Sequence, residues 1–318
     1  MAAARKPLFD KRKLALTRAR LRAWWDGEDF DQETAQAAIE AELAAANMNA
    51  EPDDLFDEPE PEPPARIVAL SKLWGDGRIR PGDDTADALE PARIGIAPEG
   101  VLAVLSPGLG ASVVALAGAH PGKIDVFEWR EEAIEMLRAQ VRKAKLANRV
   151  SVTLVDLEAH VWPASMYDGL YSVDDFAYAG YPPHLAMQIA KCLKPGACAV
   201  AEAYVGLPTQ ELATAFASSF AEPQIRAHGD LLQFFTDAGL ALEADEDLTE
   251  EMLDRARHGF RRLEGALKES GGLDAGAARE LIWETEAWRA RMKLMTQRRL
   301  ERRRFIVRKP GEAAETAS

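Results

Sequence analysis

The sequence predicts an α/β protein built on a mostly parallel sheet with helices on both faces. Short apolar runs rich in β-branched residues alternate with helical segments from Arg66 onward, which is typical of such a sheet. An apolar strand ending at Leu105 runs straight into a turn carrying Gly108 and Gly110, and a helix follows. The 318 residues, 47% of them apolar, can bury a sizeable core, so a mainly disordered chain is excluded.

The predicted elements follow one another in the order that a parallel sheet requires. A lead-in covers 66–95. Expected strands cover 100–105, 123–128, 151–155, 168–173, 197–204 and 240–246, and expected helices cover 111–119, 130–147, 183–193, 208–218 and 229–238. Helical sequence then runs from 249 to about 303 and precedes a short last strand, Arg304–Arg308. A strand reached after a helical insertion is suited to an antiparallel edge hairpin with 240–246, so we expect it to be reversed.

The first 64 residues differ in composition from the rest. Residues 1–48 are expected to form a helical extension, which begins with a basic amphipathic helix over 5–22. This helix either packs on its own domain, which we favour, or docks on an acidic protein partner. Residues 49–64 combine acids with prolines and are expected to form an extended linker. The main domain then spans 65–309, and 310–318 is expected to be a disordered tail.

Composition excludes several classes of protein. The net charge of −13 argues against a protein that coats nucleic acid, because phosphate binding needs a basic face. No apolar run approaches the roughly 20 residues of a membrane-spanning helix, and the basic start lacks the apolar core of a secretory signal. Two isolated cysteines, Cys192 and Cys198, fit a reducing compartment and form no metal-binding cluster. We therefore expect a cytoplasmic protein without a structural metal.

Three successive strand ends carry residues suited to a nucleotide-like ligand. The turn at Gly108 and Gly110 lets the backbone approach a ligand, and the following helix offers unpaired amides to an anion. An ordinary strand-to-helix turn is the alternative. Glu128 ends the next strand, where such folds bind ribose hydroxyls, and Trp129 beside it either covers an adenine or packs in the core. Asp156 ends the third strand and is placed to accept a hydrogen bond from an exocyclic amine.

In these features the sequence resembles the class I S-adenosylmethionine-dependent methyltransferases over about residues 66–309. The resemblance rests on the glycine turn, on Glu128 and Asp156, on Asp174-Asp175 after the strand at 168–173, and on the turn Leu193-Lys-Pro-Gly196. It implies a Rossmann-like, seven-stranded, mostly parallel sheet with a reversed last strand. It also implies S-adenosylmethionine as the cofactor and a small molecule as the methyl acceptor.

The resemblance further implies roles for individual residues. Ser106, Gly108 and Gly110 are expected near the methionine part of the cofactor, and Glu128 at the ribose. The adenine is expected beside the residues Trp129, Asp156 and Leu157, and Asp174 near the sulfonium. The stretch 73–82 looks like the lead-in of phosphoethanolamine N-methyltransferases, which slightly favours nitrogen over oxygen as the methyl acceptor atom.

The first motif departs from the family pattern. Val104 replaces the acid that usually orients the turn and helps hold the cofactor's ammonium, and Ser106 replaces the first glycine. Losing one charge-assisted contact weakens binding by roughly tenfold to a hundredfold, unless another carboxylate such as Asp174 supplies the charge. The departure leaves open a methyltransferase-like scaffold without catalysis. A dehydrogenase is disfavoured because Val113 stands where the third glycine or alanine of its fingerprint belongs.

The sequence does not identify a catalytic residue. The loop after 168–173 carries Asp175, Tyr178, Tyr181 and His184, any of which a substrate could meet, although Tyr-Pro-Pro-His is also a good helix lead-in. The densely basic run 289–309 is expected to form a solvated face, with a site for an anionic substrate or RNA as the second interpretation.

Overall fold

One seven-stranded sheet, in the order β3-β2-β1-β4-β5-β7-β6, forms the centre of the computed structural model. The structure describes residues 31, 34, 63–216, 223–269 and 273–311. The strands are β1 (Val101–Leu105), β2 (Lys123–Glu128), β3 (Val150–Leu154), β4 (Tyr167–Val173), β5 (Leu193–Gly206), β6 (Ala241–Asp247) and β7 (Leu300–Arg308). Strands β1 to β5 pair in parallel, whereas β7 runs antiparallel to both β5 and β6. The predicted α/β class with a reversed last strand is confirmed, while the expectations for 1–48, most of 49–64 and the end of the tail lie outside the described residues.

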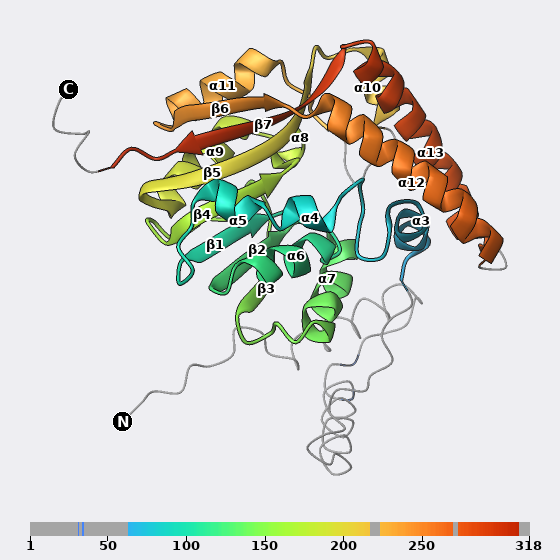
Figure 1. Ribbon diagram of the computed structural model, residues 1–318, viewed down its shortest axis with the longest axis horizontal. Helices are drawn as coiled ribbons and strands as arrows, with labels where there is room; N and C mark the ends of the chain where they lie inside the picture. Colours follow the sequence, from blue (N-terminus) through green and yellow to red (C-terminus); the bar gives the residue numbers. More distant parts are fainter. Residues whose placement is uncertain (1–30, 32–33, 35–62, 217–222, 270–272, 312–318) are drawn as a thin grey trace. The chain divides into compact units, whose positions relative to one another are not determined.

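Helices cover both faces of this sheet (Figure 1). Against one face lie α5 (Glu90–Ile94), α6 (Ala111–Ala119) and α7 (Glu131–Lys143), and against the other lie α9 (Pro182–Cys192) and α11 (His228–Asp237). The alternation of side chains along β1 supplies both cores, because Leu102 and Val104 face α6 and α7 while Ala103 and Leu105 face α9 and α11.

A third apolar cluster joins α3 (Ala65–Trp74) to two long helices, α12 (Thr249–Glu269) and α13 (Ala275–Thr296), which together we call the cap. The predicted insertion forms these two helices, which pack against α3 from the lead-in (Figure 1). The Trp74 ring lies 4.9 Å from that of Trp288 and 6.1 Å from that of Phe260, both edge-on. Trp288 is buried, whereas Trp283, one turn or more earlier on the same helix, is 57% exposed. Only one of the two tryptophans on α13 therefore joins the cap to the lead-in.

Short helices complete the described chain. They are α4 (Asp84–Asp87), α8 (Asp175–Tyr178) and α10 (Gln210–Ala215). Helix α4 lies in the lead-in, and α8 follows β4 directly. Helix α8 was not expected from the sequence. Nowhere in the described ranges is there a helix both long and apolar enough to cross a bilayer.

Several element boundaries differ from expectation. The last strand begins at Leu300 rather than Arg304, and α13 ends at Thr296, so the helical insertion stops before 303. Strand β5 begins at Leu193 and contains the Lys-Pro-Gly stretch, because a register shift between Tyr167 and Gly169 of β4 accommodates these residues as an irregularity in the ladder.

Phe305 is expected to be a major contributor to stability. It is fully buried on β7 and packs against Phe235 of α11, with ring centroids 5.6 Å apart. Phe305→Ala should lower the free energy of unfolding by about 3–5 kcal/mol in urea titrations. Ile282→Ala, at a side chain 64% exposed, is the control and should cost less than about 0.5 kcal/mol. Equal losses in the two variants would contradict this assignment of the core.

Candidate functional site

The glycine turn after β1 is covered by the lead-in. Gly108 and Gly110 have φ of 87° and 114°, a region that favours glycine. A Cβ atom added at Gly108 would lie 2.9 Å from Cγ1 of Ile79. Gly77–Arg80, which we call the strap, also binds the turn: Gly77 O accepts from the Ala111 amide at 3.1 Å, and Arg80 Nη2 donates to Ser106 O at 3.1 Å. The close approach that Gly108 permits is therefore made here by the strap, whereas a Cβ atom added at Gly110 would lie 2.9 Å from Cβ of Gln140.

Ser106, the non-glycine residue of the motif, has a partner beneath the turn. Its hydroxyl donates to Oδ1 of Asp175, and the Ser172 hydroxyl donates to Oδ2 of the same carboxyl at 2.6 Å. Asp175 is fully buried, and this burial raises its pKa to about 6. The Ser106 side chain is therefore directed to an internal acid, and Asp175 supports the turn. Val104, at the position of the missing acid, packs in the apolar core on the α6 and α7 face.

The Glu128 carboxylate is fully engaged within the protein. Oε2 accepts from the Gly108 amide at 2.9 Å. Oε1 accepts from the amides of Trp129 and Arg130, each at 3.0 Å, and from Arg130 Nη1 at 2.8 Å. Each carboxylate oxygen offers about two lone-pair sites, so the three donors fully occupy Oε1, whereas Oε2 has one donor. Glu128 is 0% exposed, and in this structure it joins the end of β2 to the glycine turn.

Arg130 occupies the space in front of Glu128. Its guanidinium carbon lies 4.3 Å from the ring centroid of Trp129 and 5.6 Å from that of Tyr178, and the two rings are 5.0 Å apart. Arg130 is only 3% exposed, and the charge of Glu128 favours the charged form of its guanidinium. Sequence reasoning missed this residue. The available signal was a cation two positions after an acid that ends a buried strand.

An outer cavity lies at the ends of β2 and β3. It has a volume of about 520 Å³, and its lining includes Trp129, Asp156, Leu157, Tyr178 and Gly180. Asp156 is exposed, and its Oδ1 accepts from the Glu158 amide at 2.8 Å, whereas Leu157 is buried in the apolar core. The structure thus brings together the three residues predicted at the adenine.

A second, inner cavity of about 40 Å³ lies under the cap. Its lining includes Arg80 from the strap, Asp174 and Tyr178 from the segment after β4, and Trp288 from α13. Tyr178 lines both cavities, Trp129 lines the outer one and Arg130 the inner one. These three stacked side chains therefore divide the crevice in two.

Asp174, predicted near the sulfonium, is paired internally. It has φ of 68°, and its Oδ1 accepts from Nη1 of Arg302 on β7. Arg302 is 1% exposed and also donates from Nη2 to Glu202 of β5 at 2.9 Å. The charge that Asp174 could have offered to a ligand ammonium is thus neutralised by an arginine that follows it by 128 positions.

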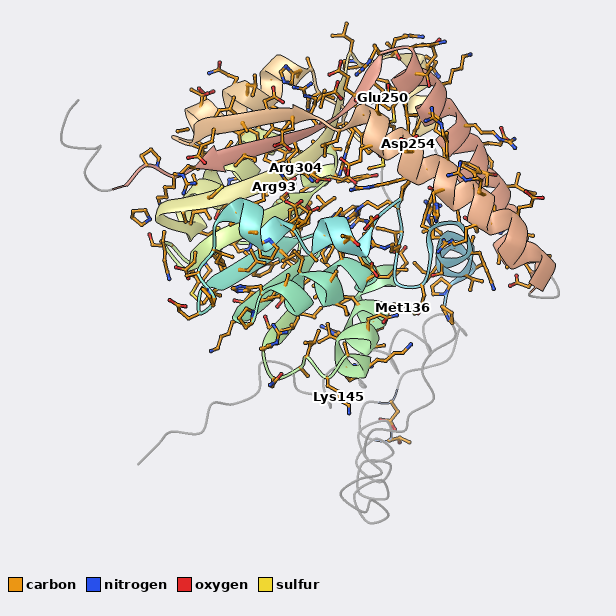
Figure 2. The ribbon with its side chains drawn as sticks, viewed as in Figure 1. Arg93, Met136, Lys145, Glu250, Asp254 and Arg304 are labelled. Carbon is orange, nitrogen blue, oxygen red and sulfur yellow. The ribbon has the colours of Figure 1, made fainter. Side chains whose placement is uncertain are left out.

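The basic segment 289–309 is not the solvated face that we expected. Arg304 is 4% exposed and donates to Glu202 at 2.7 Å and to Glu90 at 2.9 Å. Figure 2 shows Arg304 beside Arg93 of α5, which also contacts Glu90 at 3.3 Å. Carboxylates on β5 and α5 therefore draw alternate arginines of β7 into the interior, while Arg298 and Arg299 remain exposed.

The other candidates for catalysis are dispersed. Tyr181 is 60% exposed, and its amide donates to Glu158 at 3.2 Å. His184 lies on α9 and lines neither cavity. Tyr178 alone among the four faces both cavities. Within the described residues, no group of three or more His, Cys, Asp or Glu side chains could hold a metal ion.

Comparison with known proteins identifies the fold. No family model and no curated protein matches the sequence. Phosphoethanolamine N-methyltransferase 2 of Haemonchus contortus, solved with phosphomonomethylethanolamine and S-adenosylhomocysteine, superposes with a TM-score of 0.67 at 16% identity over 77% of this chain. The match spans only 57% of that chain.

Two further solved structures superpose over most of their length. A putative sarcosine dimethylglycine methyltransferase of Galdieria sulphuraria gives a TM-score of 0.64 at 15% identity, over 77% of this chain and 98% of its own. Geranyl diphosphate C-methyltransferase of Streptomyces coelicolor gives 0.55 at 14% identity, over 71% and 78%. The chain therefore has the class I methyltransferase fold, as its sequence predicts.

Arg302 should matter more to stability than an exposed arginine of the same segment. Arg302→Met leaves Asp174 without this partner in the interior and should lower the free energy of unfolding by about 3–5 kcal/mol. Arg298→Met removes an exposed pair with Asp247 and should cost less than about 1 kcal/mol. Urea unfolding of both variants measures the difference, and an Arg302→Met loss no greater than that of Arg298→Met would contradict a structural role for the buried pair.

Asp175 should make stability depend on pH. Because its pKa is raised from 3.8 to about 6, the folded protein holds this proton more tightly than the unfolded chain. Its stabilising contribution is fully present below the unfolded pKa and is lost as pH rises through 6. Relative to Asp175→Asn, the wild type should therefore lose on the order of 2–3 kcal/mol between about pH 4 and pH 7. Unfolding titrations across this range that show a constant difference would refute the assignment.

Proposed function

We propose that this protein is an S-adenosylmethionine-dependent methyltransferase acting on a small molecule, with an amine nitrogen slightly favoured over oxygen as acceptor. The observation that carries the proposal is the outer cavity, which gathers Trp129, Asp156 and Leu157 at the ends of β2 and β3. The class I fold and the resemblance of the lead-in support it. The net charge of −13 supports a small-molecule acceptor over nucleic acid.

The residues present fit the adenine end of the cofactor as they stand. Trp129 offers an aromatic face and Leu157 an apolar border, and the Asp156 carboxylate, which accepts from the Glu158 amide through Oδ1, keeps capacity to accept from an exocyclic amine. The ribose end fits once Arg130 leaves Glu128, because Glu128 is 0% exposed and a ribose hydroxyl can reach it only when the Arg130 side chain moves. We therefore propose that Trp129, Asp156 and Leu157 hold the adenine and that Glu128 binds the ribose after exchanging Arg130.

When bound, the cofactor supplies a methyl group already activated on a sulfonium, so alignment of the acceptor provides most of the rate. The chain's own residues then bind, orient and exclude water. The strap holds the glycine turn, and the cap closes the inner end of the crevice with Trp288. Tyr178, which faces both cavities, is placed to contact both ligands.

A scaffold without catalysis is the second candidate function. Three observations favour it: Glu128 is buried and paired with Arg130, Asp174 is paired with Arg302, and Val104 is apolar. Each removes a charge expected to hold the cofactor. We also propose that the protein works in the cytoplasm. A protein partner for the basic helix over 5–22 remains a prediction, since that segment lies outside the described residues.

Removal of Arg130 should strengthen cofactor binding. Arg130→Ala removes the side chain that competes with a ribose hydroxyl for the buried Glu128 carboxylate, so the Kd of S-adenosylhomocysteine in calorimetric titration should fall about tenfold or more. Glu128→Gln removes the ribose acid and should weaken binding. Arg138→Ala, on the exposed face of the same helix α7, is the matched control and should leave the Kd unchanged.

Two outcomes would contradict the proposal in different ways. Weaker binding by Arg130→Ala would show that Arg130 holds the ligand itself. No binding by either the wild type or a folded Arg130→Ala variant would eliminate the cofactor site and favour the scaffold.

A further inference from the structure

The inner cavity gathers several arginines under the cap. Arg66 comes from α3, Arg80 from the strap, Arg130 from the end of β2 and Arg291 from α13. The acids in the lining are Asp174 and Glu284. The cations of this lining outnumber its carboxylates, so the pairing of each arginine decides the local charge.

Three of these arginines have carboxylate partners. Arg66 lies 3.3 Å from Glu284, and Arg291 lies 3.7 Å from the same carboxylate. Arg130 is bound to Glu128, and Asp174 is bound to Arg302. Among the residues that the structure describes, no carboxylate pairs with Arg80. Its Nη2 donates to Ser106 O, and its Nη1 is buried without an acceptor.

The tyrosines near Arg80 do not supply the missing negative charge. Tyr171 and Tyr204 both interact electrostatically with Arg80, but burial raises the pKa of Tyr204 to about 12 and that of Tyr171 well above its usual value. Both phenols therefore stay neutral at physiological pH. A guanidinium with a buried, unsatisfied N–H and no counter-ion is costly, and a bound anion would remove this cost.

The size of the cavity restricts the anion. At about 40 Å³ the inner cavity is much smaller than the outer cavity of about 520 Å³, so it favours a compact anion. A carboxylate has three heavy atoms, whereas a phosphate has five. We infer that the inner cavity is a carboxylate-binding site centred on Arg80 and that the methyl acceptor is a small molecule bearing a carboxylate.

The cap side of the lining favours the acceptor as the source of this carboxylate; the alternative source is the cofactor's own carboxylate, because Arg80 binds Ser106 of the turn that is expected near the methionine part. The cap and α3 contribute Arg66, Trp288 and Arg291, and these elements lie outside the sheet whose strand ends form the outer cavity. The Arg130, Trp129 and Tyr178 side chains stand between the two cavities. The assignment to an acceptor rests on the proposed function, whereas the anion site itself does not.

Acetate is the probe for this site. Thermal unfolding of the full chain is followed in sodium acetate and in sodium chloride at equal ionic strength. At several times its Kd, acetate should raise the Tm by about 2–4 °C over chloride. Arg80→Met should abolish this shift, and Arg80→Lys should keep part of it. Arg289→Met, at an exposed arginine of α13, is the matched control and should keep all of it.

The Tm without acetate gives an independent readout. Because Arg80→Met removes a half-buried cation whose buried Nη1 lacks an acceptor, its Tm in chloride should equal or exceed that of the wild type. A lower Tm would indicate a merely structural role for Arg80 and overturn the inference. The inference is also overturned if acetate acts no better than chloride on the wild type, or if Arg80→Met keeps the full shift.

Saturating S-adenosylhomocysteine distinguishes the two sources of a carboxylate. An acetate shift that persists in its presence supports an acceptor carboxylate, whereas loss of the shift shows that the cofactor's own carboxylate fills the cavity and overturns the assignment to the acceptor. Failure of S-adenosylhomocysteine to bind overturns the proposed function and leaves the acetate result intact. Absence of an acetate shift beside normal S-adenosylhomocysteine binding overturns the anion site alone.

Discussion

The hydrogen bonding of the buried Glu128 carboxylate is the interaction on which the rest of the site depends. It receives the Gly108 amide, two amides that open the segment after β2, and the guanidinium of Arg130. The same four bonds therefore fix the glycine turn, the end of the strand and the wall between the two cavities. A ligand that uses Glu128 has to replace a buried, charge-assisted bond, so access to the site is coupled to the position of one arginine.

Pairing of buried charge also organises the sheet. Strand β7 carries Arg302 and Arg304 into the interior, where Glu202 of β5 accepts from both. Asp174 and Glu90 extend this network to the segment after β4 and to α5. Breaking one member would leave an uncompensated charge, which explains how so charged a strand can lie between β5 and β6. Arg80 differs because no carboxylate of the described residues pairs with it, and this is the physical basis for assigning it a ligand.

Periodicity and strand-end chemistry could predict the sheet, the glycine turn and the gathering of Trp129, Asp156 and Leu157, because the carboxyl ends of parallel strands meet at one edge. Pairings between distant residues could not be predicted. From sequence alone Arg302 is predicted to be a solvated cation, because its partners Asp174 and Glu202 are distant in the chain. For the same reason the start of β7 at Leu300 could not be recognised among charged residues. Arg130 was overlooked because Glu128 was expected to bind a ligand, whereas in the structure its carboxylate binds the neighbouring Arg130.

A crystal structure of the protein with S-adenosylhomocysteine tests the divided crevice most directly. We expect the adenine to lie in the outer cavity beside Trp129 and Asp156 and the ribose to bind Glu128. We also expect the Arg130 guanidinium to have left its 2.8 Å contact with Glu128. A bound ligand that leaves the contact between Arg130 and Glu128 intact would contradict the role of Arg130 as the group that closes the ribose site.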